Sequence, residues 1–481
     1  MSQPCRSVVG VVMPTDEPLF LRAEQNLDQY TAVYRSTRDR LTRNAVRELA
    51  RKSSAERVEH LVDAAIDCVR SAPTQSFPII AVLDATGFDA PFVYRYFTSR
   101  DHLEWLARLI EFEATLTADT TMIIEKLTSC STAADVLAAI DVWLREADQP
   151  RSRANRMNRF ASLAAVLRYD DALDRYATMA ERLLALGTCG TRVLHSRHML
   201  CPIVDPASMN EFMFIAPMTR VIVDLYPDLI SHDTWVPVIH RAYAIHLDSE
   251  CTSRYADPES TVDIPADDTR IAQALDDWLA NRALTPDAAA IISATVPITR
   301  ASLTGDFTVH QVADAAGVTT SHLYRHFDSK EFIRRTALVA NFGATTSTLL
   351  SEFEQLLNAT SADEALDHVR SWVHALTSPN DATGRRLGMQ TLGHLVTGDD
   401  PSSDALTRDT IVEILDRFAA TITVGQDRGW FTTDVDAYAL GAFVFGVLTA
   451  QAFFDPCPTA APAEPWTRHM EHLLTSMLIA D

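Results

Sequence analysis

The chain of 481 residues has few of the features that sheets and catalytic loops require. It contains only 15 glycines, and it lacks the alternating apolar and polar runs of half-buried strands. It has no GxSxG sequence, no phosphate-binding loop and no glycine-rich dinucleotide turn. These absences favour helices and leave no candidate catalytic centre, so the sequence predicts a protein that is not an enzyme and has no cofactor.

Cysteine and histidine do not form a recognisable disulfide or metal pattern. The seven cysteines are an odd number without a CxxC pair, which suits a reducing cytoplasm. The pairs His195–His198 and His469–His472 have HxxH spacing but no acidic or thiol ligand arranged nearby. We therefore expect no metal site. The N-terminus lacks a secretory signal pattern, and we expect a cytoplasmic protein.

One uncharged run resembles a membrane span. The sequence AYALGAFVFGVLTAQAFF, at 437–454, carries no charge, and its length is near the minimum for crossing a bilayer. The run includes Gln451, lacks basic flanks and follows an acidic turn. A buried helix in a bundle is the better interpretation, and we expect no membrane partner.

Positive charge is concentrated near the N-terminus. The formal net charge is −22, which opposes nucleic-acid binding overall. Residues 35–57, however, carry eight basic against three acidic side chains. Within them Arg43, Arg47 and Arg51 are four apart and would form a stripe on one helix face. We expect this basic arm to attract phosphates; the alternative is a solvated helix face that binds nothing.

The sequence contains one unit in two copies. Trp143 recurs as Trp372 at an offset of 229, and Trp235 recurs as Trp466 at an offset of 231. Five further residues recur at an offset of 230: Phe77, Gly87, Tyr94, Arg95 and Phe97 as Phe307, Gly317, Tyr324, Arg325 and Phe327. Apolar residues three and four apart fill both copies, so we predict a duplicated, all-α domain.

The second copy contains the pattern of a helix-turn-helix. Apolar spacing predicts a short helix over 309–316. Gly317 then permits a turn with positive φ, and Thr319 can cap the next helix. In that helix Leu323 and Phe327, four apart, are expected to point into the core. The residues that then fall on the outer face, as in a helix that enters the major groove, are Thr320, Ser321, His322 and Arg325.

The string AAGVTTSHLYRHFDSKE resembles the signature of the tetracycline-repressor (TetR) family, with its glycine turn, Tyr-x-His-Phe and Ser-Lys-Glu. The resemblance implies a three-helix DNA-binding head followed by a helical body for ligand binding and dimerisation. It implies that Tyr324, His326 and Lys330 hold phosphates, with Arg325 on the same outer face. Packing of an ordinary helical hairpin is the alternative for Tyr324 and His326. The residues implied to face base edges are Thr319, Thr320, Ser321 and His322.

The first copy, LDATGFDAPFVYRYFTSRD, departs from this pattern on its reading face. Asp89, Ala90, Pro91 and Phe92 replace the four reading residues and offer few hydrogen bonds to bases. Asp89 would repel phosphate unless it caps the helix. We expect this head to discriminate sequences poorly, through Phe92 against a thymine methyl. Four residues stand at its DNA-contact positions: Tyr94, Arg95, Tyr96 and Arg100.

We divide the chain into six expected segments. They are an N-terminal extension with the basic arm (1–54), a degenerate helix-turn-helix head (55–108), a helical body (109–255), an acidic linker and lead-in (256–284), a second head (285–340) and a second body (341–481).

Duplication suggests a pseudo-dimer within one chain. The family resemblance implies that the last two long helices of each subunit form a four-helix bundle; here they would span 208–224, 235–250, 437–454 and 466–479. The small residues Gly441, Ala442 and Gly446 would allow close approach. A monomeric pseudo-dimer could read an asymmetric operator. The alternative is a homodimer that uses only the second head.

The resemblance also implies a small-molecule effector between the body helices. Aromatic and methionine side chains could line such cavities and would suit an apolar ligand, although these residue types at helical spacing are more often core. The candidates are Trp143, Met157, Phe160, Trp372, Met389 and His394.

The sequence thus predicts a one-component transcription regulator, in the first instance a repressor, whose partner is a double-stranded DNA operator. The alternative is an all-helical scaffold that binds small molecules or proteins and has lost DNA binding.

Overall fold

The computed structural model describes residues 55–71, 77–247, 268–302, 305–377, 382–397, 401–457 and 463–478. Every regular secondary-structure element within these ranges is a helix, which confirms the all-α class. None of the helices in the described part of the chain is both long enough and apolar enough to cross a membrane. The uncharged run instead contains α19 (Ala437–Ala450), whose side chains are almost all buried.

Two series of helices follow one another along the chain. The N-terminal series comprises α2 (Ala55–Ser71), α3 (Ile79–Thr86), α4 (Ala90–Tyr96), α5 (Arg100–Thr128), α6 (Ala133–Glu146), α7 (Pro150–Val166), α8 (Asp170–Ser196), α9 (Pro206–Leu225) and α10 (His232–His246). The C-terminal series comprises α12 (Pro286–Ala301), α13 (Val309–Ala316), α14 (Thr320–His326), α15 (Lys330–Glu354), η1 (Gln355–Asn358), α16 (Ala362–Leu376), α17 (Ala382–Thr397), α18 (Pro401–Asp427), α19, η3 (Gln451–Phe453) and α20 (Ala463–Leu478).

The helices of the two series begin at matching places. Helices α3, α4 and α5 start at positions 79, 90 and 100, and α13, α14 and α15 start at 309, 320 and 330, a constant offset of 230. Helices α8, α9 and α10 start at 170, 206 and 232, and α18, α19 and α20 start at 401, 437 and 463, a constant offset of 231.

Side-chain caps at corresponding positions begin α5 and α15. Ser99 accepts a hydrogen bond from His102 N–H and begins α5, as Ser329 accepts one from Phe332 N–H and begins α15. A serine oxygen at this position satisfies one of the backbone donors that a helix start leaves unpaired. The same local chemistry therefore starts both long helices.

Helix α11 (Asp268–Ala280) lies within the segment expected to be a linker and lead-in, and it packs against α15. The indole Nε1–H of Trp278 donates to Thr410 Oγ1 at 3.2 Å. The same indole lies so close to Gly343 that a Cβ there would clash with it. The segment 268–280 thus forms an ordered helix docked on the C-terminal series.

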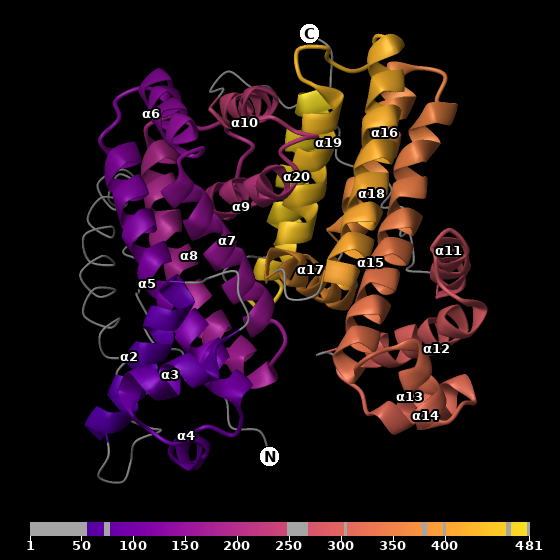
Figure 1. Cartoon of the computed structure of the whole chain (residues 1–481). Coiled ribbons are helices and arrows are strands. Elements are labelled where there is room, and N and C mark those ends of the chain that lie inside the picture. The colour runs from indigo at the N-terminus through magenta and orange to yellow at the C-terminus, as the bar shows by residue number, and fades with distance from the viewer. Residues whose placement is uncertain are drawn as a thin grey trace, which may run out of the picture.

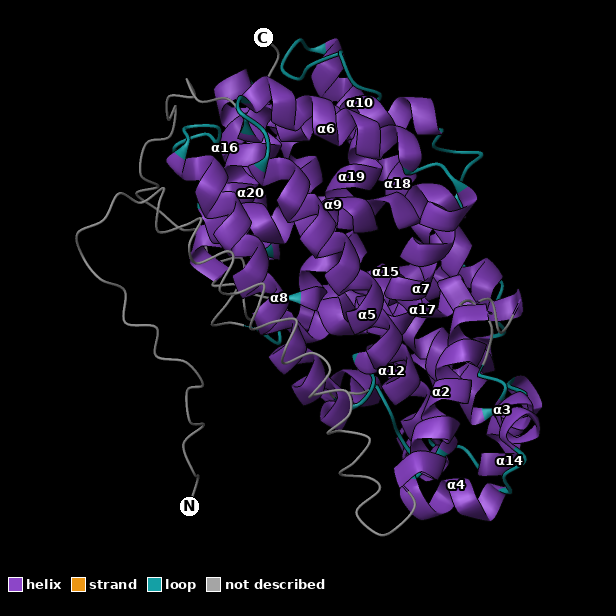
Figure 2. Ribbon diagram, turned by 90° about the vertical axis from the view of Figure 1, so that its left-hand side faces the viewer, coloured by secondary structure: helices purple, strands orange, loops and turns teal. Residues whose placement is uncertain are grey.

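Buried apolar side chains form two clusters. The larger draws on both series and on α9, α10, α19 and α20 together. The smaller joins α11 to α12, α13, α14 and the first half of α15. Figure 1 shows the two series side by side, with α4 and α14 at one end of the molecule, and Figure 2 shows the same end after rotation by 90°.

Four helices meet where the two series pack together. Helix α9 packs along α19, where a Cβ on Gly446 would lie 2.9 Å from Thr219 Cβ. Gly441 faces Phe418 of its own series instead, so only one of the two glycines serves this crossing. Helix α10 packs on α20, with His246 Nε2 2.5 Å from His469 Nε2.

Candidate nucleic-acid interface

The turn between α13 and α14 has the geometry expected from its sequence. Gly317 has φ of 65°, the left-handed region that a Cβ disfavours. Thr319 Oγ1 accepts a hydrogen bond from His322 N–H and begins α14. Leu323 and Phe327 are 0% and 2% exposed, so their burial anchors α14 to the body of the head. The predicted helix-turn-helix is confirmed at these positions.

The outer face of α14 is open to solvent. Thr319, Ser321 and Arg325 are exposed, and Tyr324 keeps 48% of its surface accessible. Thr320 and His322 are half-buried. These residues lie on one side of a short helix whose other side is buried, which is the arrangement that a base-reading helix requires.

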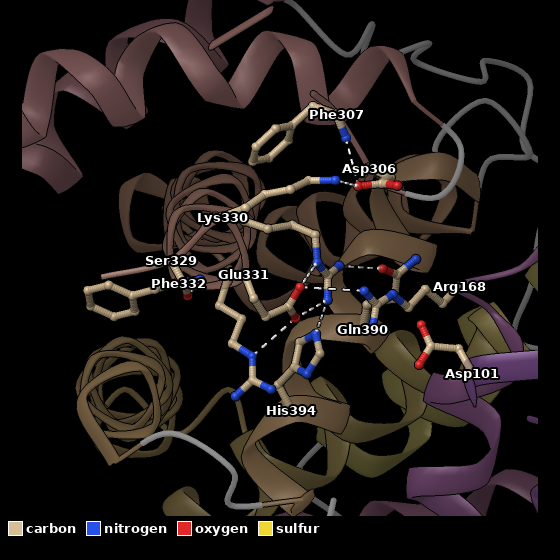
Figure 3. Close-up of polar contacts among 12 residues, drawn as sticks. Asp101, Arg168, Asp306, Phe307, Ser329, Lys330, Glu331, Phe332, Gln390 and His394 are labelled. Carbon is tan, nitrogen blue, oxygen red and sulfur yellow. Dashed lines mark hydrogen bonds and ion pairs between the residues drawn. The ribbon is translucent and has the colours of Figure 1, made fainter. Parts of the chain in front are cut away.

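Lys330 lies at the first position of α15, shortly after the end of α14. Its Nζ is 2.7 Å from Asp306 Oδ1 and 5.6 Å from the centre of the Phe307 ring (Figure 3). Burial alone would raise the pKa of Asp306, but the hydrogen bonds from Lys330 and Phe307 N–H lower it. A phosphate bound by Lys330 would therefore compete with, or share the ammonium with, a stable carboxylate.

His326 is turned partly inward. Its Nδ1 is 3.3 Å from Thr285 Oγ1, and its Nε2 is 3.5 Å from Asp287 Oδ2. His322 Nε2 is 3.4 Å from the same carboxylate oxygen. Both histidines predicted to contact DNA thus face Asp287 of α12, a contact that their positions in the sequence did not predict.

Head 1, which we define as α2–α4 with the first turn of α5, has the same turn. Gly87 has φ of 66°, and Asp89 Oδ1 accepts a hydrogen bond from Phe92 N–H at 3.0 Å. Asp89 is therefore the N-cap of α4, which is the condition under which its charge was expected to be tolerated near phosphate. Pro91 lies in the first turn of α4, where its missing N–H costs little.

The expectation for Phe92 is wrong. The Phe92 ring is only 5% exposed, because it packs 4.4 Å from the Phe88 ring and 5.2 Å from the Tyr96 ring, measured between centroids. The Arg57 guanidinium lies 4.4 Å from the Phe92 ring centre and covers it. The ring is thus a packing residue within head 1 and does not present its face to a thymine methyl.

The other DNA-contact candidates of head 1 lie toward solvent. Tyr94 is 56% exposed, Arg95 and Arg100 are exposed, and Tyr96 is half-buried. Arg100 Nε lies 3.4 Å from Asp101 Oδ1. The basic arm with Arg43, Arg47 and Arg51 lies outside the described residues.

The six candidate effector residues lie in different places in the structure. Three of them, Met157, Phe160 and Met389, are buried in the core. Trp372 lines a cavity of about 70 Å³ within the C-terminal series, and His394 lines a second cavity, between the two series. Trp143 is half-buried and lines neither. The six do not form a common apolar pocket.

The cavity between the two series has a volume of about 310 Å³ and is polar. Helices α5 and α7 line one side, and α15 and α17 line the other. Its charged and ionisable lining residues are Arg100, Asp101, Glu104, Arg108, Arg168, Tyr169, Glu331, Arg335 and His394.

A hydrogen-bonded network at this cavity joins the two series (Figure 3). Glu331 Oε2 accepts from Arg334 Nε at 3.0 Å and lies 3.4 Å from Arg168 Nη2 of the other series. Burial alone would raise the pKa of Glu331, but the hydrogen bond from Arg334 and the charges of Arg334 and Arg168 hold it well below its usual range. Glu331 is therefore a carboxylate clamped between the series.

His394 completes the network. Arg334 Nη2 is 2.7 Å from His394 Nε2, and burial followed by the charges of Arg334 and Arg335 lowers the pKa of His394 well below its usual value. The neutral imidazole can then accept the bond from Arg334. Sequence reasoning did not identify Arg168, Glu331 or Arg334; the only signal was that Glu331 follows Lys330 in the Ser-Lys-Glu string.

Comparison with known proteins supports a DNA-binding segment. Residues 304–335 match the model of the family described as bacterial regulatory proteins, tetR family. The match covers α13, α14 and the beginning of α15. No curated protein matched the chain in a sequence search. Within residues 304–335 the chain is thus similar to the DNA-binding domain of TetR-type regulators.

Proposed function

We propose that the protein is a one-component transcription regulator of TetR type that binds double-stranded DNA mainly through head 2, defined as α12–α14 with the first turn of α15. The observation that carries the proposal is the exposed polar face of α14, held by a buried Leu323 and Phe327, within the segment that matches the tetR family. An operator that overlaps a promoter would make the protein a repressor.

We further propose that the N-terminal and C-terminal series are duplicated units that form a pseudo-dimer in one chain. Support comes from helix starts at constant offsets of 230 and 231, and from the packing of α9 and α10 on α19 and α20. Head 1 and head 2 lie at the same end of the molecule, as two heads must if they contact one duplex (Figure 1). Two unlike heads would read an asymmetric operator, because no exact two-fold axis relates them.

The two heads would divide the work of binding. Head 2 offers Thr319, Thr320, Ser321 and His322 to base edges. Head 1 offers exposed Tyr94, Arg95 and Arg100 for phosphates, and the proposed basic arm would add to this sequence-independent attraction. With Phe92 buried, head 1 would contribute even less base discrimination than its sequence predicted.

We propose that an effector, if it uses the 310 Å³ cavity, carries charged or hydrogen-bonding groups. Arginines and carboxylates line this cavity, so an entirely apolar ligand would leave them desolvated and unpaired. Glu331 in the network is adjacent to Lys330 at the DNA-facing end of α15. A ligand that displaced Glu331 from Arg168 would break this ion pair between the two series and so change how they pack near the heads.

The proposal is tested by selecting bound sequences from a random duplex DNA pool with the wild-type protein, Lys330→Ala and Lys126→Ala. Lys126 is an exposed lysine in the last turn of α5, remote in the sequence from both turns, and serves as the matched loss of one charge. We expect an asymmetric site with the wild type and Lys126→Ala, and reduced recovery with Lys330→Ala. A palindromic site would favour two chains using head 2 alone, and no enrichment would favour the scaffold that does not bind DNA.

A further inference from the structure

Three potential metal ligands converge between α14 and the start of α12. His322 and His326 are four residues apart and project from the same face of α14, while Asp287 lies in the first turn of α12. One donor atom from each side chain lies within 4.8 Å of the donor atoms of the other two. Two imidazole nitrogens and one carboxylate oxygen are a donor set typical of divalent transition metals.

If His326 Nδ1–H donates to Thr285 Oγ1, the other ring nitrogen, Nε2, is left with a lone pair for a ligand. The Nδ1 of His326 is within hydrogen-bond distance of Thr285 Oγ1, whereas its Nε2 is enclosed and makes no hydrogen bond. With Nδ1–H donating to Thr285, the lone pair of Nε2 faces Asp287 Oδ2 at 3.5 Å. Two acceptors in this position repel each other unless a proton or a cation lies between them. A metal-bound histidine commonly donates its other ring N–H to a nearby oxygen acceptor.

We propose that Asp287, His322 and His326 form a binding site for a divalent transition-metal ion such as Zn²⁺. The ligand atoms would be the Nε2 atoms of both histidines and an Asp287 oxygen, with water completing the coordination. Zinc bonds of about 2.0–2.2 Å place tetrahedral donors about 3.3 Å apart. The present distances of 3.4 Å and 3.5 Å from Asp287 Oδ2 to the two nitrogens already suit this geometry, and the remaining adjustment falls on a half-exposed His322.

Head 1 does not have these ligands. At the offset of 230 that relates the two heads, Arg57 stands at the position that corresponds to Asp287, and Phe92 and Tyr96 stand at the positions that correspond to the two histidines. Phe92 is buried under Arg57, so the cationic guanidinium occupies the region that a metal would take in head 2. The site would therefore distinguish the two heads.

Metal binding would regulate head 2, an inference that rests on the proposed function. His322 is proposed to read bases, and a metal would hold its Nε2 against Asp287. This nitrogen could then not bond to DNA. We infer that the metal ion weakens DNA binding by head 2.

The metal site itself is tested without DNA. The full-length protein, treated with a chelator and dialysed, is titrated with Zn²⁺ by isothermal calorimetry alongside Asp287→Asn, His326→Gln and His310→Gln. His310 is an exposed histidine of the same head, on α13, and provides the matched control. We expect the wild type and His310→Gln to bind Zn²⁺ at this site with the same affinity. In Asp287→Asn and His326→Gln the affinity of the site should be at least tenfold lower. Equal affinity and stoichiometry in all four proteins would overturn the site. Zinc that bound only to cysteines elsewhere would give this result.

Regulation is tested with Asp287→Asn, because Asp287 is not a proposed DNA contact. We expect Zn²⁺ to lower the affinity of the wild type for its selected DNA at least tenfold, and to leave Asp287→Asn unchanged. Equal zinc effects on both proteins would reject the regulatory role. Absence of DNA binding in both, with the calorimetric difference intact, would reject the proposed function and retain the metal site.

Discussion

At the scale of single residues, Lys330 lies between the proposed DNA contact and the ion pair that joins the two series. It follows the N-cap Ser329 and precedes Glu331, which contacts Arg168 of the other series. Its ammonium is held by Asp306. The proposed phosphate contact is thus prepared in position, since little side-chain freedom remains to be lost on binding.

We predict that Lys330→Ala weakens binding to all DNA sequences by a similar factor. A phosphate contact carries no base information, so its removal should reduce the slope of log affinity against log salt by about 1. Fluorescence anisotropy with specific and unrelated duplexes at several salt concentrations measures this. Selective loss of affinity for the specific duplex alone would contradict the phosphate role.

Glu211 on α9 gives a prediction for pH. It is 1% exposed, its Oε1 has no hydrogen-bond partner, and burial followed by the charge of Asp205 raises its pKa to about 9. The folded protein therefore holds a proton that the unfolded chain releases above its ordinary pKa of about 4.3. Stability from this group is fully present below that value and is lost as pH rises toward 9.

We expect Glu211→Gln to remove this loss. The variant should be more stable than the wild type by roughly 2–5 kcal/mol at pH 8, and the difference should shrink to about 1 kcal/mol at pH 5. Urea unfolding at both pH values measures it, with the exposed Glu56→Gln as the control. A difference independent of pH would show that Glu211 is not held protonated.

At the scale of elements, the crossing of α9 and α19 depends on a small residue. A Cβ on Gly446 would lie 2.9 Å from Thr219 Cβ and 3.0 Å from its backbone Cα, so the helices would have to separate. We predict that Gly446→Ala is destabilising. Overpacking costs about 1–3 kcal/mol of stability. Alanine gains about 1 kcal/mol over glycine in helix propensity, which offsets only the lower end of this cost. A midpoint of urea unfolding equal to or above that of the wild type would contradict this packing.

The N-terminal arm is a second element-scale prediction. If Arg43, Arg47 and Arg51 bind phosphates, deletion of residues 1–54 should lower the salt dependence of DNA affinity by about 2–3 in slope, since each phosphate that is no longer neutralised accounts for about 0.9. The same titrations used for Lys330→Ala measure the change. An unchanged slope would mean that the basic stripe is a solvated face.

Local sequence could predict the head because its determinants are local. The positive φ of Gly317, the cap by Thr319 and the burial of Leu323 each depend on residues within a few positions. The prediction for Phe92 was wrong for the opposite reason. Its position on α4 is correct, but its burial depends on Phe88 before the helix and on Arg57 of α2.

At the scale of the whole molecule, the proposed pseudo-dimer predicts the mass of the protein in solution. If the two series satisfy each other's dimerisation surfaces, the protein should be monomeric, with a mass of 53.3 kDa in solution. Light scattering coupled to size-exclusion chromatography, at several concentrations, measures it. A stable species of twice this mass would favour the homodimer that uses only the second head.

The sequence by itself determined the helical class, the helix-turn-helix of head 2 and the recurrence of residues at an offset of about 230. These follow from apolar periodicity, caps and glycine turns, which act over one or two helical turns. Only the tertiary structure decided that Glu331 meets Arg168, 163 residues away, and that Asp287 meets His322 and His326. Such contacts depend on how whole helices pack, because side chains distant in the chain become neighbours only when their helices share a buried face.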